Sequence, residues 1–188
     1  MSSTAGARTF TIVFVCTANR FRSPLAAAVL AKELEGRRVR ILSRGTLDVG
    51  AMPPLAAALA TATELGIDLS RHRARQLRPD DLVDSGLVIG FESKHLEAAR
   101  KAGAKPELIF GLEEAVAAFE RLDRRPGVKH YPSSLRHAVT VANRLRDPEG
   151  TLAEIEDPVR KSPTEAAAIG RRIHSLSLRL ARQLSPRK

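Results

Sequence analysis

The chain has 188 residues, 43% of them hydrophobic, so it is long enough to bury one sizeable core. Its single cysteine excludes an internal disulfide and cannot by itself build a zinc or iron–sulfur site. We expect one domain over residues 1–188, with residues 1–8 flexible and with no metal or cofactor. The start of the chain lacks the apolar run of a signal peptide, and no segment approaches the roughly 18 to 20 apolar residues of a membrane span, which favours a cytoplasmic protein.

The net charge of +10 is concentrated in the C-terminal third of the chain. Residues 1–120 contain 16 Lys and Arg against 14 Asp and Glu, whereas residues 121–188 contain 15 against 7. Such an excess attracts anionic partners, nucleic acids among them. Because only 4% of the residues are aromatic and no helix-turn-helix or zinc-finger pattern occurs, a nucleic-acid partner is less favoured than a solvated, arginine-rich face.

Short apolar segments alternate with helical ones along the chain. Runs of β-branched, aliphatic and aromatic residues predict strands over residues 10–15, 39–42, 87–91 and 107–110. Strong helix formers predict helices from Pro24 to Gly36 and over residues 53–65, 94–101 and 163–184. Ser162 is the expected N-cap of the last helix. This alternation predicts an α/β fold with a parallel sheet and helices on both faces.

The segment from Cys16 to Ser23 lies between the first strand and the first helix, where α/β folds bind ligands. Backbone N–H groups there can form an anion nest, the helix N-terminus adds partial positive charge, and Arg22 offers a fork of donors that matches phosphate oxygens. A buried cysteine alone is most often a core residue. With an arginine six residues later at a helix start, Cys16 instead indicates phosphate chemistry through a phosphocysteine intermediate.

The segment VFVCTANRFRSPLAAAVL at residues 13–30 resembles the N-terminus of low-molecular-weight protein tyrosine phosphatases and their bacterial arginine-phosphatase relatives. The similarity continues over residues 42–46 and 64–77 and resumes at Asp157-Pro158. A stretch near residues 115–155 is longer than the family pattern. The resemblance implies a Rossmann-like α/β fold with three α/β/α layers around a central four-stranded parallel sheet, and we expect a monomer or a weak homodimer.

The resemblance also implies roles for individual residues. Cys16 is the expected nucleophile, Arg22 the phosphate ligand, Ser23 a stabiliser of the thiolate, and Asn19 the residue that holds the loop in shape. Asn tolerates the left-handed backbone conformation better than most residues. The residues expected to surround the phosphate are Thr17, Ala18, Asn19, Arg20, Phe21, Arg22 and Ser23.

The resemblance also implies a role for one histidine. His72 lies in a segment whose histidine braces the phosphate loop in the family, and we expect it to do so with Ser43 and Asn19; a surface or structural role for His72 stays open. The other histidines show no metal-ligand spacing and are expected to be ordinary surface residues: His95, His130, His137 and His174.

The leaving group needs a proton, and two Asp-Pro pairs are candidates for the donor, at residues 147–148 and 157–158. In the family, an Asp-Pro pair that supplies the general acid stands shortly before the last helix. Asp157 fits this position, whereas Asp147 precedes Glu149-Gly150, which is typical of an ordinary turn. We therefore favour Asp157.

Several positions depart from the family pattern. Ala18 stands where glycine is usual, which predicts backbone strain, and Phe21 stands where a second cysteine often allows a regulatory disulfide. Residues 47–50 and Val159 replace the aromatic walls of the tyrosine phosphatases, which predicts a weaker grip on a phosphotyrosine ring. Thr17 matches the arginine-phosphatase branch. Phosphotyrosine and phosphoarginine therefore both stay open as substrates.

Three functions stay open at this point. The leading one is a phosphatase acting on a phosphorylated protein or a small phosphate compound, with phosphate or sulfate able to occupy the loop. An arsenate reductase would use the same loop but commonly needs further cysteines, so here it would require an external thiol. A non-catalytic module on the same fold would bind anions or nucleic acid without turnover.

Overall fold

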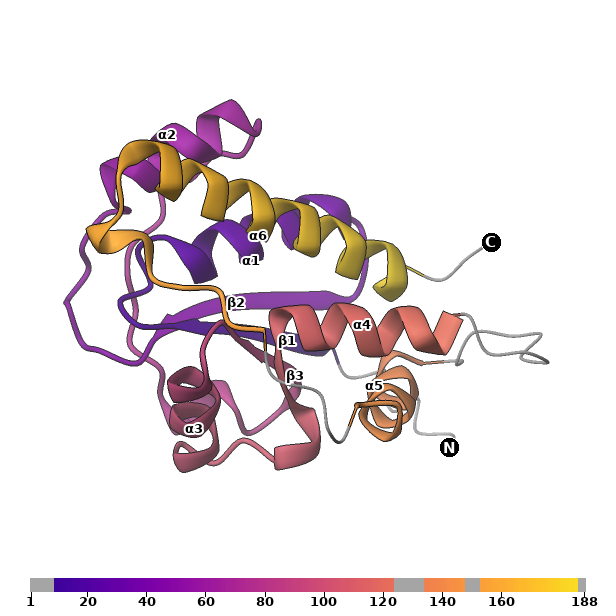
Figure 1. The fold of residues 1–188 in the computed structure, drawn as a ribbon. Coiled ribbons are helices and arrows are strands. Elements are labelled where there is room, and N and C mark those ends of the chain that lie inside the picture. The colour runs from indigo at the N-terminus through magenta and orange to yellow at the C-terminus, as the bar shows by residue number, and fades with distance from the viewer. Residues whose placement is uncertain (1–8, 124–133, 148–152, 186–188) are drawn as a thin grey trace.

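The computed structural model describes residues 9–123, 134–147 and 153–185. Its centre is a four-stranded parallel sheet in the order β2-β1-β3-β4 (Figure 1). The strands are β1 (Phe10–Cys16), β2 (Val39–Gly45), β3 (Ser85–Gly90) and β4 (Ile109–Gly111). The predicted four-stranded parallel sheet is confirmed.

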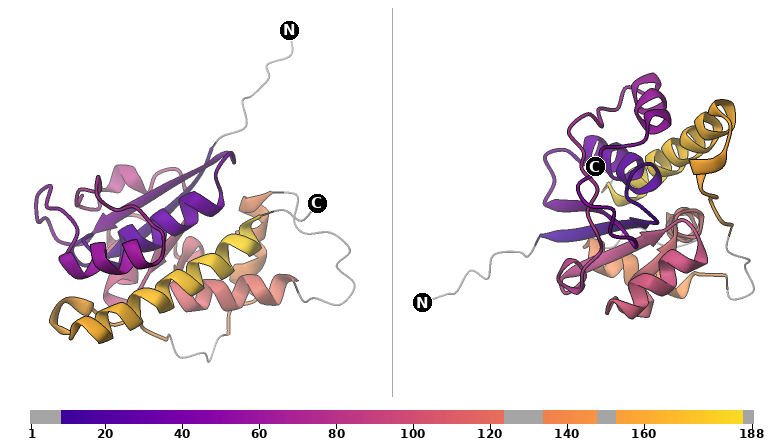
Figure 2. Two further views of the ribbon diagram at one scale, coloured as in Figure 1. Left: turned by 90° about the horizontal axis from the view of Figure 1, so that it is seen from above. Right: turned by 90° about the vertical axis from the view of Figure 1, so that its left-hand side faces the viewer.

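Helices cover both faces of this sheet. They are α1 (Arg22–Glu33), α2 (Ala56–Glu64), α3 (Ser93–Lys101), α4 (Leu112–Asp123), α5 (Leu135–Arg144) and α6 (Pro163–Leu184). Figures 1 and 2 show α1, α2 and α6 on one face and α3 on the other. Alternation along β1 explains this division, because Ile12 and Phe14 join the larger core whereas Val13 and Val15 join the smaller one. The three-layer α/β/α prediction is confirmed.

The carboxyl end of β1 positions the loop that follows it. Cys16 is the last residue of β1 and pairs with Gly45 at the end of β2. A Cβ atom on Gly45 would lie 3.0 Å from backbone atoms of Thr17, Ala18 and Asn19. The loop therefore packs directly on the end of β2, and only glycine leaves room for it.

The C-terminal helix α6 begins as predicted. The Ser162 hydroxyl accepts a hydrogen bond from the Glu165 N–H, and the Glu165 side chain reaches back to the Ser162 N–H, which completes a capping box. Pro163 occupies the first turn, where its missing N–H has no partner to lose. Helix α6 packs on α1, α2 and α4, so it completes one layer of the fold.

Several element boundaries differ from the prediction, and prolines explain two of them. The expected strand over 107–110 starts at Ile109, because Pro106 begins a 3-10 turn in which the Leu108 N–H bonds the Lys105 carbonyl at 2.9 Å. The expected helix over 53–65 starts at Ala56. Pro54 biases Pro53 away from helical conformation, and Leu55 after the proline pair is extended and is the N-cap.

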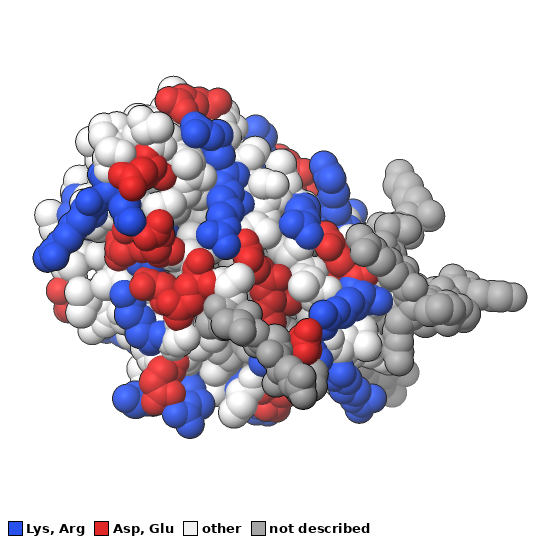
Figure 3. Space-filling model, in the orientation of Figure 1, with Lys and Arg blue, Asp and Glu red and all other residues white. Residues whose placement is uncertain are grey.

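Acidic partners offset part of the basic charge of the C-terminal third. Arg172 Nη2 lies 2.7 Å from Glu113 Oε1, and Arg179 Nε lies 2.8 Å from Glu120 Oε1, so α6 is paired with α4 along its length. On the face shown in Figure 3, basic and acidic side chains are interspersed. This face presents no continuous basic surface. Among the described residues, no helix combines the length and apolar character that a membrane crossing requires.

Candidate active site

Cys16 lies at the base of the loop and is 3% exposed. Its Sγ atom is 3.0 Å from Ser23 Oγ, seven residues later in the first turn of α1. The Ser23 hydroxyl also lies 3.2 Å from the Arg44 carbonyl and accepts a hydrogen bond from Asn19 Nδ2 at 2.8 Å. A hydroxyl held in this way can stabilise a negative sulfur next to it.

Asn19 holds the bend of the loop. It is fully buried and has a φ of 54°, in the left-handed region. Its side chain donates to Ser23 and accepts from the Arg75 N–H at 2.9 Å, which ties the loop to the segment after α2. The strain expected at Ala18 is absent, because among the described non-glycine residues only Asn19 has positive φ. That part of the prediction was wrong.

His72 supports the same bend from outside. Its Nε2 atom lies 2.7 Å from the Asn19 carbonyl, which can only accept, so Nε2 carries the hydrogen. Burial lowers the pKa of His72, and with the nearby arginines it outweighs the hydrogen bond to Asn19, which raises that pKa. The expected partnership with Ser43 is not found: among the described hydrogen bonds, none joins the Ser43 side chain to the loop, and its neighbour Arg44 contacts Ser23 through a backbone carbonyl.

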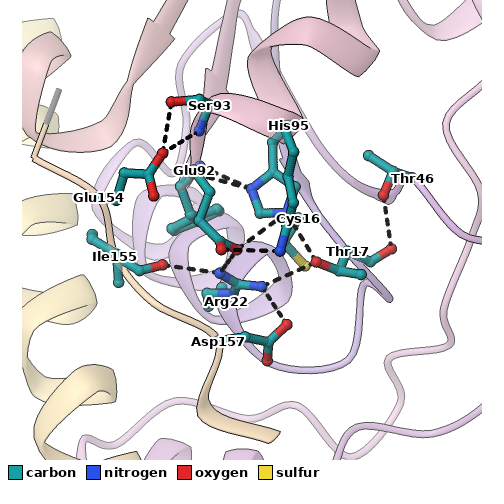
Figure 4. Close-up of polar contacts among 12 residues, drawn as sticks. Cys16, Thr17, Arg22, Thr46, Glu92, Ser93, His95, Glu154, Ile155 and Asp157 are labelled. Atoms are coloured by element: carbon teal, nitrogen blue, oxygen red, sulfur yellow. Dashed lines mark hydrogen bonds and ion pairs between the residues drawn. The ribbon is translucent and has the colours of Figure 1, made fainter.

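Arg22 is 1% exposed, and its guanidinium lies at the centre of the polar contacts in Figure 4. Its Nη1 donates to Glu92 Oε2 and to the Ile155 carbonyl, the latter at 2.9 Å. Its Nη2 donates to Asp157 Oδ2 at 2.6 Å and to Thr17 Oγ1 at 3.2 Å. The guanidinium fork is therefore held in place by two carboxylates before any anion binds.

The two Asp-Pro pairs lie in different places. Asp157 is beside Arg22, and its other oxygen accepts from the Val159 N–H at 3.1 Å. The Asp147 carboxylate instead lies 3.5 Å from the Arg121 guanidinium, and both of these side chains are exposed. The structure thus brings Asp157, and not Asp147, to the loop.

Glu92 is a site residue that the sequence reasoning missed. It follows β3 and is the N-cap of α3, and its carboxylate contacts both Arg22 and Lys94. Burial by itself raises the pKa of the Glu92 carboxyl, but hydrogen bonds from these two cations outweigh burial and lower it. An acidic residue directly after a predicted buried strand was the available signal, because the carboxyl ends of parallel strands share one edge of the sheet.

His95 was predicted to be an ordinary surface residue, and this was wrong. Its side chain is 0% exposed, and Nε2 lies 3.0 Å from Thr17 Oγ1. Burial, followed by the Arg22 charge, lowers the pKa of His95 to about 4. Of the other histidines, His137 is exposed, His174 is half-buried, and His130 lies outside the described residues.

Comparison with known proteins identifies this arrangement. The family model described as low molecular weight phosphotyrosine protein phosphatase matches residues 11–124, which is more than half of the chain. The chain belongs to this family. It is therefore a cysteine-dependent phosphatase, and the arsenate-reductase alternative is not favoured.

Individual relatives agree with this assignment. A probable low molecular weight protein-tyrosine-phosphatase, EpsP of Ralstonia nicotianae, is 32% identical over 55% of this chain and 71% of its own. A Streptomyces coelicolor low molecular weight protein-tyrosine-phosphatase is 34% identical over 58% of this chain and 73% of its own. The structure of the YwlE arginine phosphatase from Geobacillus stearothermophilus superposes with a TM-score of 0.67 at 26% identity, covering 93% of this chain and 92% of that one.

The phosphatase site has a narrow mouth with one aromatic residue, Phe21, among the described residues that line it. A pocket of about 20 Å³ opens above Cys16, lined in part by Phe21, Leu55 and Val159. Leu47 and Val159, at the positions where we expected aromatic walls to be missing, are 54% and 61% exposed. Among the described residues, no cluster of three or more His, Cys, Asp and Glu side chains is arranged to hold a metal ion.

Proposed function

We propose that this phosphatase removes phosphoryl groups from protein side chains through a covalent intermediate on Cys16. The observation that carries this proposal is that one loop places the Cys16 sulfur beside the Ser23 hydroxyl and at the foot of a pocket also lined by Arg22 and Asp157. A thiolate nucleophile, a fixed guanidinium and a carboxyl group are the three components that phosphoryl transfer through cysteine requires.

Substrate binding would replace a contact that is already present. The pocket of about 20 Å³ is close to the space of one water molecule, and Asp157 occupies one arm of the Arg22 fork. A phosphoryl group that binds Arg22 displaces the Asp157 carboxylate from it. Released from Arg22, the Asp157 carboxyl can then act as the proton donor to the leaving atom.

The reaction then takes two steps. The Cys16 thiolate attacks phosphorus, the sulfur–phosphorus bond forms, and the bond from phosphorus to the leaving oxygen or nitrogen breaks as Asp157 gives that atom its proton. Next, Asp157 accepts a proton from water, the water oxygen bonds to phosphorus, and the sulfur–phosphorus bond breaks. Inorganic phosphate leaves and the thiolate is restored, so neither a metal nor a redox partner is needed.

Asp157→Asn separates these two steps. With a phosphotyrosine peptide, we expect kcat/KM to fall by roughly 10²- to 10⁴-fold, because the leaving group loses its acid. With para-nitrophenyl phosphate, whose leaving group needs little protonation, the first turnover should stay fast while the second step slows. Rapid-quench kinetics should therefore show a burst of para-nitrophenol equal to the enzyme concentration.

The chain supplies a matched control in its other Asp-Pro pair, at residues 147–148. Asp147→Asn changes the same residue type in the same sequence context, but its partner is the exposed Arg121, so its kinetics should equal those of the wild type. An equal loss in both variants, or a fully active Asp157→Asn enzyme, would remove Asp157 from the mechanism.

For the substrate, we propose phosphoarginine in preference to phosphotyrosine. A phosphotyrosine ring gains its grip from flanking aromatic rings, and here aliphatic Leu55 and Val159 line the mouth beside the single ring of Phe21. The aliphatic chain of phosphoarginine suits such walls. Thr17 in the loop and the likeness to the YwlE arginine phosphatase support the same choice.

A parallel assay tests this choice. Phosphate release is measured from a protein phosphorylated on arginine and from a phosphotyrosine peptide at equal concentrations. We expect a higher kcat/KM for phosphoarginine, and Val159→Tyr should shift the ratio toward phosphotyrosine by adding a ring at the mouth. A wild-type preference for phosphotyrosine would contradict the proposed substrate but leave the phosphatase mechanism intact.

We also propose that residues 1–188 act as one phosphatase domain. Helix α6, beyond the residues matched by the family model, packs on α1, α2 and α4, and Asp157 lies one short turn before it. The site therefore draws on both ends of the described chain. Phosphate or sulfate is the expected small ligand of the loop, as in the sulphate complex of the tyrosine phosphatase Wzb from Escherichia coli K30, which superposes with a TM-score of 0.66 at 20% identity over 93% of this chain and 98% of that one.

A further inference from the structure

The hydrogen-bond partners of His95 determine which ring nitrogen carries its hydrogen. His95 is the third residue of α3, and its Nδ1 faces the backbone N–H groups of Glu92 and Phe91 at 3.1 and 3.4 Å. A backbone N–H can only donate, so Nδ1 is an acceptor and carries no hydrogen. The neutral ring therefore has its hydrogen on Nε2.

This tautomer fixes the direction of the next hydrogen bond. His95 Nε2 donates to Thr17 Oγ1 at 3.0 Å, and Arg22 Nη2 donates to the same oxygen at 3.2 Å (Figure 4). A threonine hydroxyl has two acceptor lone pairs and one hydrogen. Both lone pairs are used, and the part of the chain that the structure describes offers no acceptor to the Thr17 hydroxyl hydrogen.

The hydroxyl lies at the active-site loop. Thr17 directly follows Cys16 in the chain, and its hydroxyl oxygen contacts the Arg22 guanidinium (Figure 4). Its backbone is also fixed, because the Thr17 carbonyl accepts from the Leu47 N–H at 2.9 Å. A donor held in this position with no acceptor is prepared for an anion that binds to Arg22.

We propose that His95 is a positioning residue that turns the Thr17 hydroxyl hydrogen toward the phosphoryl group of the substrate. Thr17 thereby becomes a side-chain donor to the bound phosphoryl oxygens, in addition to Arg22 and the backbone of the loop. The inference rests on the proposed function, because it assigns a further contact within the same site.

The surroundings of His95 keep its imidazole ring in the neutral form at neutral pH. The groups that face the ring are the cations of Arg22 and Lys94 and the carboxylates of Glu92 and Asp157. Burial is the largest influence, and burial and the two cations outweigh the two carboxylates and lower the pKa of His95 to about 4. The ring therefore stays neutral, with Nδ1 free to accept, above about pH 5.

A double-mutant cycle tests the proposal. His95→Asn places an amide oxygen where Nδ1 lies, so the cap of α3 is kept, but its shorter side chain does not reach Thr17. Thr17→Val keeps the shape of the threonine and removes the hydroxyl. We expect each single variant to lower kcat/KM by about 10- to 100-fold, the effect of one hydrogen bond to a charged group. The double variant should be no worse than Thr17→Val, because His95 acts through Thr17.

A matched control and a direct observation complete the test. His137 is the third residue of α5 and is exposed, so His137→Asn changes a histidine at the same helix position away from the site, and its kinetics should equal the wild type. In nitrogen-15 spectra of the full chain, His95 should show the Nε2–H tautomer and should not titrate between pH 6 and pH 8.

The outcomes against the proposal are separate from a failure of the proposed function. Additive losses in the cycle, or an Nδ1–H tautomer, would overturn the role of His95 even in an enzyme whose activity depends on Cys16. Activity that survives in Cys16→Ser would instead remove the phosphocysteine mechanism. Thermal unfolding of each variant shows whether a loss of activity reflects a loss of fold.

Discussion

Cys16→Ser is expected to lower the phosphatase activity of this protein by about 10⁴-fold or more. Serine keeps the size of the side chain and its contact with the Ser23 hydroxyl, but an alcohol is a far weaker nucleophile than a thiolate at neutral pH. The measurement is phosphate release from para-nitrophenyl phosphate and from a phosphoarginine protein, with wild-type enzyme in parallel.

The loop itself should survive this substitution. Binding of inorganic phosphate, measured by calorimetry, and the thermal unfolding midpoint should both stay close to the wild type, since the Arg22 guanidinium and the backbone of the loop are unchanged. If Cys16→Ser kept more than a tenth of the wild-type kcat/KM, the phosphocysteine mechanism would be wrong.

Arg22→Lys is expected to cost about 10³-fold or more in kcat/KM, although it conserves the charge. Arg22 makes four hydrogen bonds through two nitrogens in one plane, two of them to the carboxylates of Glu92 and Asp157. An ammonium group is a point charge and cannot hold the Glu92 carboxylate and a phosphoryl group in the same fixed geometry. Steady-state kinetics and phosphate affinity, measured together, should both decline.

The same substitution at an exposed arginine provides the comparison. Arg37 lies after α1, away from the loop, so Arg37→Lys should leave kcat/KM unchanged. Arg22→Lys should also unfold at a lower temperature than Arg37→Lys, because Arg22 is buried and its carboxylate partners lose their matched donor. An Arg22→Lys enzyme within tenfold of the wild type would show that a positive charge alone suffices.

Local sequence was enough to predict the place of the loop. The strand that ends at Cys16 and the helix that follows the loop are both predicted from residues that are neighbours in the chain, although the helix starts at Arg22 and not at Pro24. The role of Asn19 in shaping the loop came from the family resemblance, and its positive φ agrees with it. The four parallel strands followed from alternating apolar and helical segments, because hydrophobic periodicity is itself a local property. Resemblance to a family then indicated Asp157 as the acid, at a position 135 residues from Arg22.

Contacts between distant segments could not be predicted in this way. Ser43 was expected to brace the loop, but the contact comes from the backbone of Arg44, and the pleat of β2 decides which residue faces the loop. His95 was expected at the surface, and Glu92 was not considered at all. Both follow the end of β3, about 70 residues after the loop.

The sequence by itself therefore determined the chemistry of this phosphatase: a cysteine, an arginine and a helix start arranged within eight residues to receive phosphate. Only the tertiary structure decided what surrounds that chemistry. Parallel pairing of Val15 in β1 with Gly90 in β3 brings two strand ends to one edge of the sheet. For that reason Glu92 contacts Arg22 and His95 contacts Thr17, although Glu92 and His95 both lie far from the loop in the sequence.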